Sequence, residues 1–466
     1  MAMTRIPVRR LKRRLGKRSV LTRLEERVLF SYDAASFRQV PELVVMPRSE
    51  NDIIQAVRFA KKCHIPITPR GAGTGMSGGA IPNKGAMVIG FERMNRILEI
   101  NQNEKYALVE PGVLTGDLQE KVLELGLFYP PDPSSYLVST LGGNVAEGAG
   151  GLRCAKYGVT KNYVLGLRVV LMSGEVITTG ALAEEPQTLD LTPLFIGSEG
   201  TLGVISLIAL RLIEAPQSTQ TLLAFFPTGT DAATAVSTIL KKRLLPSVME
   251  FLDRMTLKAI TGHVPLDIPE LAEAMLLIEV DGTELEISEQ LPLVMECCQR
   301  YQGFQMLQAS ESKERNRLWE LRRSVSPSLA RLASGKINED VCVPRGELIR
   351  LVERCQELSK HTGLMIPVYG HAADGNLHVN VMFDRNDQDQ IDHAQFAVEQ
   401  IFHKTLELGG TLTGEHGIGR TKREYLPMQF PPKYLEYFRN IKKVWDSEGL
   451  MNPGVMYPSE NSTENT

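Results

Sequence analysis

The segment Pro69-Arg-Gly-Ala-Gly-Thr-Gly-Met-Ser-Gly-Gly79 contains five glycines and no acidic residue. It follows Ile65-Pro-Ile-Thr68, which we expect to form a short buried strand. A glycine-dense turn after a strand allows backbone N–H groups to approach a ligand closely, and the usual ligand is an anion such as phosphate. The segment therefore predicts a phosphate-binding loop. A flexible surface loop is the alternative that the local sequence leaves open.

This loop matches neither of two standard phosphate-binding patterns. The Walker pattern requires a lysine directly after its last glycine, and none follows here. The Rossmann pattern requires a helix that begins at its third glycine, whereas Ala80-Ile-Pro-Asn-Lys-Gly85 is typical of a loop. We therefore expect a pyrophosphate cradle of another kind.

Two further glycine-dense segments lie downstream, Thr140–Gly151 and Phe195–Ile205. Small residues allow a helix or turn to lie flat against a planar or phosphate-bearing ligand. The segment Thr140–Gly151 begins about 70 residues after the start of the Pro69–Gly79 loop. Two such ligand-binding segments are harder to explain by chance than one.

Length and composition are those of an ordinary globular chain. The 466 residues predict two or three domains, and the net charge of −3 gives no reason to expect a nucleic-acid partner. No window of 18 apolar residues occurs, so we expect no transmembrane segment. The six cysteines form no Cys-x-x-Cys pair, which excludes a local iron–sulfur motif and indicates a reducing, cytoplasmic location.

The N-terminal region is strongly basic. Nine arginines and lysines, from Arg5 to Arg23, precede the first acidic residue, Glu25. No apolar segment follows them, so a secretory signal is not expected. A basic helix of this kind either docks on a partner or an anionic surface, or presents a solvated face; we favour the solvated face.

The pattern of elements changes at Pro216. Beyond it, Thr221–Phe226, Ser247–Leu252 and Met275–Val280 predict strands of a separate antiparallel sheet. Helical patterns over residues 231–243 and 284–300 alternate with these strands. This alternation predicts an α+β second domain.

Histidines gather in two glycine-containing motifs near the C-terminus. His371 and His378 flank the tight-turn pair Asp374-Gly375, and Glu415-His416 stands between Gly414 and Gly417. His378 and Asn380 project from one face of an extended segment, and His371 could converge with His378 across the turn. A single histidine is more often a satisfied polar residue than a ligand. Two histidines with a carboxylate are a common divalent-metal set, so the combination favours a site.

These segments together resemble the FAD-linked oxidases of the vanillyl-alcohol-oxidase type, over residues 20–458. The similar branch includes glycolate oxidase flavoprotein subunits, D-lactate dehydrogenases and D-2-hydroxyglutarate dehydrogenases. The motifs that carry the resemblance are Arg70–Gly79, Asp132-Pro-Ser134, Gly142-Gly-Asn-Val-Ala146, Gly150-Gly151, Gly200–Ile205, His371–His378, Gly414–Gly419 and Asn452-Pro-Gly454.

The resemblance implies an α+β architecture with a two-subdomain FAD-binding domain and a C-terminal cap with an antiparallel sheet. The expected divisions are a basic helical segment (1–36), the FAD-binding domain (37–214), the cap (215–440), a helix and loop that pack back on the FAD domain (441–458) and a disordered tail (459–466).

The resemblance also implies the cofactor and the residues that bind it. Covalent members of the family carry a histidine in the first glycine loop, and this loop has none, so we expect non-covalent FAD. The expected FAD-binding residues are Pro69, Arg70, Gly71, Ala72, Gly73, Thr74, Gly75, Met76, Ser77, Gly78, Pro133, Ser134, Thr140, Gly142, Gly143, Asn144, Gly150, Tyr157, Gly200, Gly203, Val204, Ile205 and Asn452.

The implied reaction is the oxidation of a small D-2-hydroxy acid, glycolate or D-lactate, to the 2-oxo acid by hydride transfer to flavin N5. A Zn²⁺, Mn²⁺ or Fe²⁺ ion on His371, His378 and Glu415 would bind the hydroxyl oxygen, and His416 would act as general base. Arg322, in Trp319-Glu-Leu-Arg-Arg323, would hold the substrate carboxylate. Ser326, Lys336 and Asn380 are the other expected substrate-binding residues.

Three alternatives remain at this point. The substrate could be D-2-hydroxyglutarate, which needs an added cation that the sequence does not locate. The chain could be a non-redox FAD enzyme of the ether-lipid synthase branch, or a flavin-binding subunit without its own substrate. The electron acceptor is expected to be a partner other than NAD, such as an iron–sulfur subunit or an electron-transfer flavoprotein.

Overall fold

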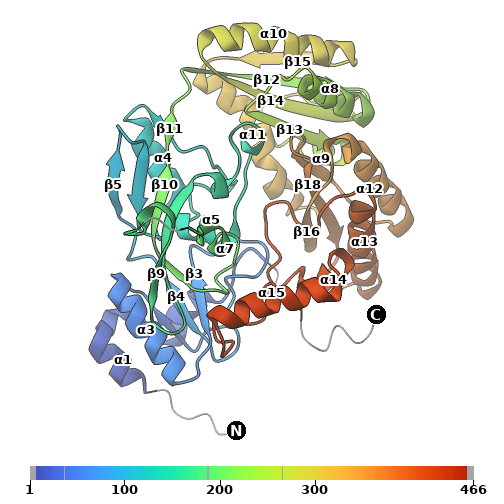
Figure 1. The fold of residues 1–466 in the computed structure, drawn as a ribbon. Coiled ribbons are helices and arrows are strands. Elements are labelled where there is room, and N and C mark those ends of the chain that lie inside the picture. The colour runs from blue at the N-terminus through green and yellow to red at the C-terminus, as the bar shows by residue number, and fades with distance from the viewer. Residues whose placement is uncertain (1–6, 36, 186–187, 265, 459–466) are drawn as a thin grey trace. The chain divides into compact units, whose positions relative to one another are not determined.

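The computed structural model describes residues 7–35, 37–185, 188–264 and 266–458 (Figure 1). The predicted disordered tail, 459–466, and Arg5 of the basic region lie outside these residues.

The described chain forms two compact units. Unit 1 contains the residues up to Gly151, Val159–Ala215 and the chain from Glu415 onward, and unit 2 contains Leu152–Gly158 and Pro216–Gly414. The chain thus returns to unit 1 at Glu415, whereas we expected its return at residue 441. Backbone hydrogen bonds explain this difference, because Ile418 and Gly419 donate to the Glu199 carboxylate and Arg420 donates to the Ser77 carbonyl.

The first sheet of unit 1 positions the glycine loop. Its strands lie in the order β1-β2-β4-β3, and β2, β4 and β3 are parallel. Strand β3 runs from Ile67 to Arg70, so it ends where the loop begins. The apolar face of α3 (Glu50–Lys62) packs on this sheet through Ile53, Val57 and Ala60. The other strands are β1 (Val20–Leu21), β2 (Leu43–Val45) and β4 (Met87–Gly90).

The second sheet of unit 1 is antiparallel, with the order β5-β6-β10-β8-β9. Two short helices that carry glycine segments pack near it, α5 (Leu141–Glu147) and α7 (Thr192–Phe195). The C-terminal helix α15 (Pro432–Trp445) packs on the same core. The ring centroids of Trp445 and Phe195 lie 5.4 Å apart. The strands are β5 (Ile97–Asn101), β6 (Tyr106–Val109), β8 (Val164–Val170), β9 (Val176–Thr178) and β10 (Val204–Arg211).

The basic N-terminal region forms helix α1 (Val8–Leu15). Leu11 and Leu15 are buried in the core that contains α3, whereas Arg9, Arg10 and Arg13 are exposed. The helix therefore uses its apolar side for packing and presents its cations to solvent.

Unit 2 is built on one seven-stranded antiparallel sheet, in the order β15-β12-β14-β13-β17-β18-β16. This sheet confirms the predicted α+β second domain. Helices α9 (Arg254–Ile260) and α11 (Ser312–Leu329) bury apolar side chains against one of its faces. The strands are β12 (Ser218–Phe226), β13 (Val248–Asp253), β14 (Ala274–Gly282), β15 (Phe304–Ala309), β16 (Gly335–Cys342), β17 (Val368–His371) and β18 (Asn376–Phe383).

Four other long helices belong to unit 2. Their pairs α8–α10 and α12–α13 are in contact, and α13 also contacts β16 and β18. They are α8 (Gly229–Lys241), α10 (Glu284–Arg300), α12 (Leu348–Thr362) and α13 (Gln388–Glu407). No helix within the described ranges is long and apolar enough to cross a bilayer.

Candidate functional site

One face of the unit 2 sheet gathers polar side chains from four neighbouring strands. Directly paired residues in antiparallel strands share a face, and so do residues two apart along a strand. The register pairs Glu250 with His371, Tyr369 with His378, and Asn338 with Asn380. We call this set the polar face; its members are Glu250, Asn338, Asp340, Tyr369, His371, Asn376, His378 and Asn380.

Glu250 lies on β13, the strand at one side of the polar face, and is fully buried. Its two carboxylate oxygens accept hydrogen bonds from Arg322 Nε of α11 and from His371 Nδ1 of β17. Burial alone raises the pKa of Glu250, but the charges of His371 and Arg322 lower this pKa to about 2. Because the ionised carboxylate only accepts, Nδ1 of His371 carries a proton and donates to it, so the role of metal ligand falls to Nε2 of this ring.

His371 and His378 come together as the sequence predicts. Their rings are perpendicular, with centroids 5.2 Å apart, and a ring nitrogen of each lies within 4.8 Å of the other. Both rings are buried. Two imidazoles, one of them oriented by a carboxylate, fit the donor set of a divalent cation such as Zn²⁺.

Glu415, the third expected ligand, directly follows Gly414, whose backbone is hydrogen-bonded within unit 2. Gly414, the last residue of that unit, donates its backbone N–H to Asp340 at 2.8 Å. A Cβ on Gly414 would lie 2.3 Å from Asn376 Oδ1, so any larger residue here would force the Asn376 side chain to move. Glu415 follows as the first residue of the returning segment of unit 1.

The expected substrate-binding residues differ in their burial. The Arg322 guanidinium is buried and lies over the Tyr369 ring, 4.7 Å from its centroid. Lys336 pairs with Met382 in the β16–β18 register, on the side of the polar face. Burial lowers the pKa of Lys336, and no acidic side chain among the described residues pairs with it. Asn380 is fully buried, whereas Ser326 is exposed on α11.

The glycine loop of unit 1 leaves room for a ligand at Gly75. A Cβ built there meets no described protein atom within 4 Å, although the residue has no positive φ that would require glycine. The backbone N–H groups of Ala72, Gly73, Thr74 and Gly75 donate to no described residue. Unpaired N–H groups beside an unfilled glycine are what a bound pyrophosphate requires.

Other residues of the loop maintain its shape. The buried Arg70 guanidinium donates to the carbonyl oxygens of Tyr32 at 2.6 Å and Ala80 at 3.5 Å. Gly73 has a φ of +72°, and a Cβ there would lie 2.1 Å from that guanidinium. Arg70, an expected FAD-binding residue, therefore stabilises the conformation of the loop through its side chain. Ala72 is exposed, and Thr74 and Met76 are half-buried.

The second glycine segment touches the first. A Cβ on Gly71 would lie 2.3 Å from Thr140 Oγ1 and 3.4 Å from Gly143 Cα. Thr140 caps α5 by accepting from the Gly143 N–H, and Asn144 donates to Thr115 Oγ1 at 2.7 Å. Gly142 lies against Pro111 so closely that a side chain is excluded. Gly150 is buried, Pro133 is half-buried and Ser134 is exposed.

The third segment and the C-terminal asparagine approach the same loop. A Cβ on Gly200 would lie 3.2 Å from Pro69, and Gly203, Val204 and Ile205 are buried. Asn452 Nδ2 donates to the carbonyl oxygens of Gly79 and Glu199, at 2.9 and 2.8 Å. Its Oδ1 is buried and has no hydrogen-bond partner among the described groups. A buried acceptor of this kind fits a donor on the cofactor.

Glu199 anchors the returning segment that carries Glu415 and His416. Each carboxylate oxygen accepts one backbone N–H, from Ile418 and from Gly419, both at 2.8 Å. A Cβ on Gly417 would lie 2.8 Å from Glu199 Oε1 and 2.4 Å from Glu147 Oε1. Burial raises the pKa of Glu199 to about 7, although these N–H groups lower it.

Tyr157, another expected FAD-binding residue, belongs to unit 2. Its hydroxyl donates to Asp281 Oδ2 at 2.9 Å, and the neighbouring Lys156 pairs with Asp281 Oδ1. These contacts fasten the short excursion Leu152–Gly158 to strand β14.

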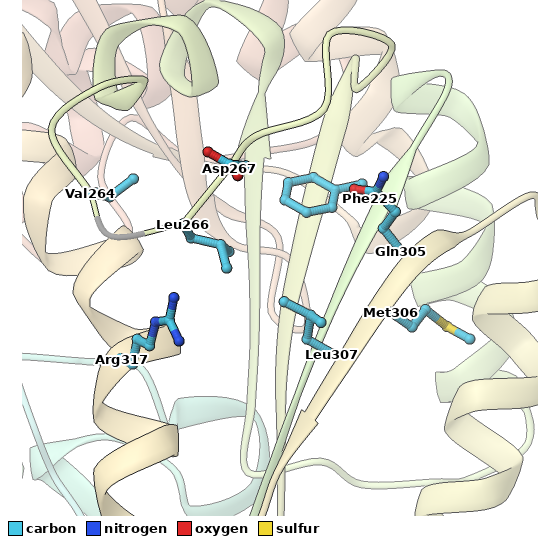
Figure 2. Close-up of a pocket in the computed structure, with 8 residues that line it drawn as sticks. All are labelled: Phe225, Val264, Leu266, Asp267, Gln305, Met306, Leu307 and Arg317. Atoms are coloured by element: carbon cyan, nitrogen blue, oxygen red, sulfur yellow. The ribbon is translucent and has the colours of Figure 1, made fainter.

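A cavity of about 500 Å³ lies at another part of unit 2 (Figure 2). It opens beside edge strand β15, with Phe225 and Leu307 on one side and Arg317 of α11 on the other. None of the expected site residues lines it. We therefore assign it no part in the chemistry.

Sequence reasoning missed two carboxylates, Glu250 and Glu199. A signal existed for Glu250, because it interrupts the apolar run Val-Met-Glu-Phe-Leu of a predicted strand, and an unpaired charge is rarely buried. Glu199 stands in the third glycine segment, but its partners are more than 200 residues away.

Two family models match the chain. Residues 41–180 match the model described as an FAD binding domain, and residues 215–456 match the C-terminal domain of FAD linked oxidases.

Curated relatives match along nearly the whole chain. The glycolate oxidase subunit GlcD of Bacillus subtilis is 39% identical over 93% of this chain and 93% of its own length. The mitochondrial D-lactate dehydrogenase [cytochrome] of Arabidopsis thaliana is 32% identical over 94% of this chain and 78% of its own length.

A solved structure of alkyldihydroxyacetonephosphate synthase has the same fold. It superposes with a TM-score of 0.78 at 20% identity, over 97% of this chain and 85% of that chain. At this identity the likeness concerns the fold alone.

Replacement of Gly75 by valine is expected to give folded protein without FAD. The new Cβ meets no described protein atom within 4 Å, and the side chain fills the space beside the unpaired N–H groups. FAD content, measured as the ratio of flavin to protein absorbance, reports the loss. Gly346→Val is the matched control, since a Cβ there also meets nothing within 4 Å. Full FAD content in Gly75→Val would show that the loop does not hold the pyrophosphate.

Replacement of Glu199 by glutamine is expected to flatten the pH dependence of stability. A folded-state pKa of about 7 lies above the ordinary glutamate pKa of 4.5, so protonation favours the folded state. The contribution of Glu199 therefore decreases as pH rises from 4.5 to 7, by at most about 3 kcal/mol. Unfolding of FAD-loaded protein at pH 5 and pH 8 measures it. An identical pH dependence in both proteins would contradict the prediction.

Proposed function

Because the chain belongs to the FAD-linked oxidase family, we propose that it oxidises a small D-2-hydroxy acid, glycolate or D-lactate, to the 2-oxo acid. Its relatives named for glycolate oxidation and D-lactate dehydrogenation support this substrate class. Unit 1 binds FAD, non-covalently, through its glycine segments. When bound, FAD supplies the acceptor for two electrons.

Arg322 binds the substrate carboxylate in this proposal. Its guanidinium presents several N–H donors in one plane, and its contacts with Glu250 and Tyr369 fix that plane. Lys336 adds a second positive charge on the same side of the sheet. The Asn380 side-chain amide donates to the His378 carbonyl oxygen at 3.3 Å, and this bond holds the amide within the polar face.

His416 removes the hydroxyl proton. The backbone of His416 is held in a turn. Gly417 follows it, and the N–H of Ile418, two residues after His416, donates to the Glu199 carboxylate. A positioned imidazole is an effective base near neutral pH. We assign a divalent cation to His371, His378 and Glu415, where it would lower the pKa of the substrate hydroxyl.

Electrons are proposed to leave through a partner other than NAD. All six cysteines are free thiols, and their spacing gives no cluster motif of this chain's own. An iron–sulfur subunit or an electron-transfer flavoprotein would serve as that partner.

The observation that carries this proposal is the polar face itself. Buried polar groups cost free energy unless they are paired. A sheet face that places two histidines and a carboxylate beside Arg322 of α11 in the interior of unit 2 is expected where an anionic substrate is bound.

The test is anaerobic addition of glycolate, D-lactate or D-2-hydroxyglutarate to FAD-loaded protein. We expect glycolate or D-lactate to bleach the flavin band near ~450 nm, because FAD accepts the substrate electrons. Bleaching by D-2-hydroxyglutarate alone would select that alternative substrate. An unchanged spectrum with every 2-hydroxy acid would leave the ether-lipid synthase alternative and refute a dehydrogenase.

Replacement of His416 by alanine is expected to slow anaerobic flavin reduction by about 10²–10⁴-fold, the usual contribution of a general base. FAD content should be unchanged, because His416 is not one of the expected FAD-binding residues. His403→Ala is the control, since His403 is exposed on α13. Reduction at the original rate would exclude His416 as the base.

Metal removal by a strong chelator is expected to suppress activity while FAD remains bound. Added Zn²⁺, Mn²⁺ or Fe²⁺ should restore it, because His371 and His378 offer nitrogen ligands that all three accept. Residual activity of His378→Ala should no longer respond to the chelator. Indifference of the original protein to chelation would refute the metal site.

A further inference from the structure

Glu250 connects two elements that carry different parts of the proposed reaction. One oxygen accepts from Arg322, on helix α11, and the other accepts from His371, on strand β17. These partners are 72 and 121 residues away in the sequence. The strand register places Glu250 directly opposite His371, so this contact follows from the sheet pairing itself.

Each partner of Glu250 is also constrained from a second side. Arg322 lies over the Tyr369 ring, and His371 lies edge-on to His378. Tyr369 and His378 are themselves a register pair, with ring centroids 5.3 Å apart. Together with Glu250, these four side chains therefore form a closed ring of contacts.

A second buried glutamate on the neighbouring strand provides a comparison. Glu279 of β14 also ties α11 to the sheet, because it accepts from Trp319 Nε1 at 2.9 Å and from Thr221 Oγ1 at 3.0 Å. It contacts neither Arg322 nor His371 in the described structure. Glu279 is thus a structural glutamate with similar burial and without the two functional partners.

We propose that Glu250 is the positioning residue that fixes the carboxylate-binding Arg322 and the metal-binding His371 relative to each other. It orients the His371 ring by accepting from Nδ1, so the role of metal ligand falls to Nε2. It orients the plane of the Arg322 guanidinium by accepting from Nε. Substrate affinity and metal affinity then depend on one side chain that touches neither ligand.

This inference rests on the proposed function, and its test separates the two. Glu250→Gln keeps the size of the side chain but replaces one acceptor oxygen by an N–H donor, so it cannot serve both partners. In chelator-treated, FAD-loaded protein we expect Zn²⁺ to bind 10–100-fold more weakly, the usual effect of losing the partner of a ligating histidine. The D-lactate concentration for half-maximal flavin reduction should also rise, by about tenfold.

Glu279→Gln is the matched control. It removes a buried charge that also ties α11 to the sheet, so it reports a purely structural cost in its unfolding temperature. Its Zn²⁺ affinity and D-lactate dependence should stay within about twofold of the original protein, because neither functional partner is touched. The inference is overturned if Glu250→Gln leaves both affinities unchanged, or if Glu279→Gln weakens them equally.

Failure of the proposed function gives a different result. If no 2-hydroxy acid reduces the flavin of the original protein, the reaction is wrong, yet the Zn²⁺ titrations still report whether Glu250 orients His371. If the original protein binds no Zn²⁺, the metal assignment is wrong, and the D-lactate dependence still reports whether Glu250 orients Arg322.

Discussion

The buried charge of Glu250 is the constraint on which the polar face of unit 2 depends. An isolated carboxylate in a protein interior is strongly unfavourable, and it persists here because Arg322 and His371 each engage one oxygen. Removal of one partner from a buried pair typically costs about 3–5 kcal/mol, since the other charge is left uncompensated. The sheet register and the position of α11 are therefore coupled to the geometry of the site.

Unit 1 solves a different physical problem, the binding of an anionic cofactor by backbone. Most glycines of its loops are required by the protein itself, as at Gly71 and Gly73, where a Cβ would collide with Thr140 or Arg70. Gly75 is different, because no described atom occupies the space beside it. Packing at Gly71 and Gly73 therefore fixes the shape of the loop, and the space beside Gly75 is left for the ligand.

Local spacing was sufficient to predict much of this architecture. The glycine segments, the antiparallel sheet beyond Pro216 and the convergence of His371 with His378 follow from short motifs and strand periodicity. The roles of Glu250 and Glu199 did not follow, because their partners lie 72 to 220 residues away and are brought near only by sheet register and by the returning chain. Burial of Arg322 and exposure of Ser326, one helical turn apart, were equally beyond the sequence pattern.

In the proposed function, the cofactor depends largely on backbone and the substrate class depends on side chains. The cofactor cradle is made largely of backbone and would serve any chemistry that FAD supports. Selectivity for a 2-hydroxy acid requires a cation for its carboxylate and a base for its hydroxyl, and these are side chains with specific neighbours.

The most direct measurement is the rate of anaerobic flavin reduction by a 2-hydroxy acid that carries hydrogen or deuterium at C2. Oxidation of the acid breaks this C2–H bond, so we expect reduction to be several-fold slower with deuterium when His416 and Arg322 are intact. Equal rates with both isotopes in a single turnover would contradict C2–H cleavage as the step that these residues promote.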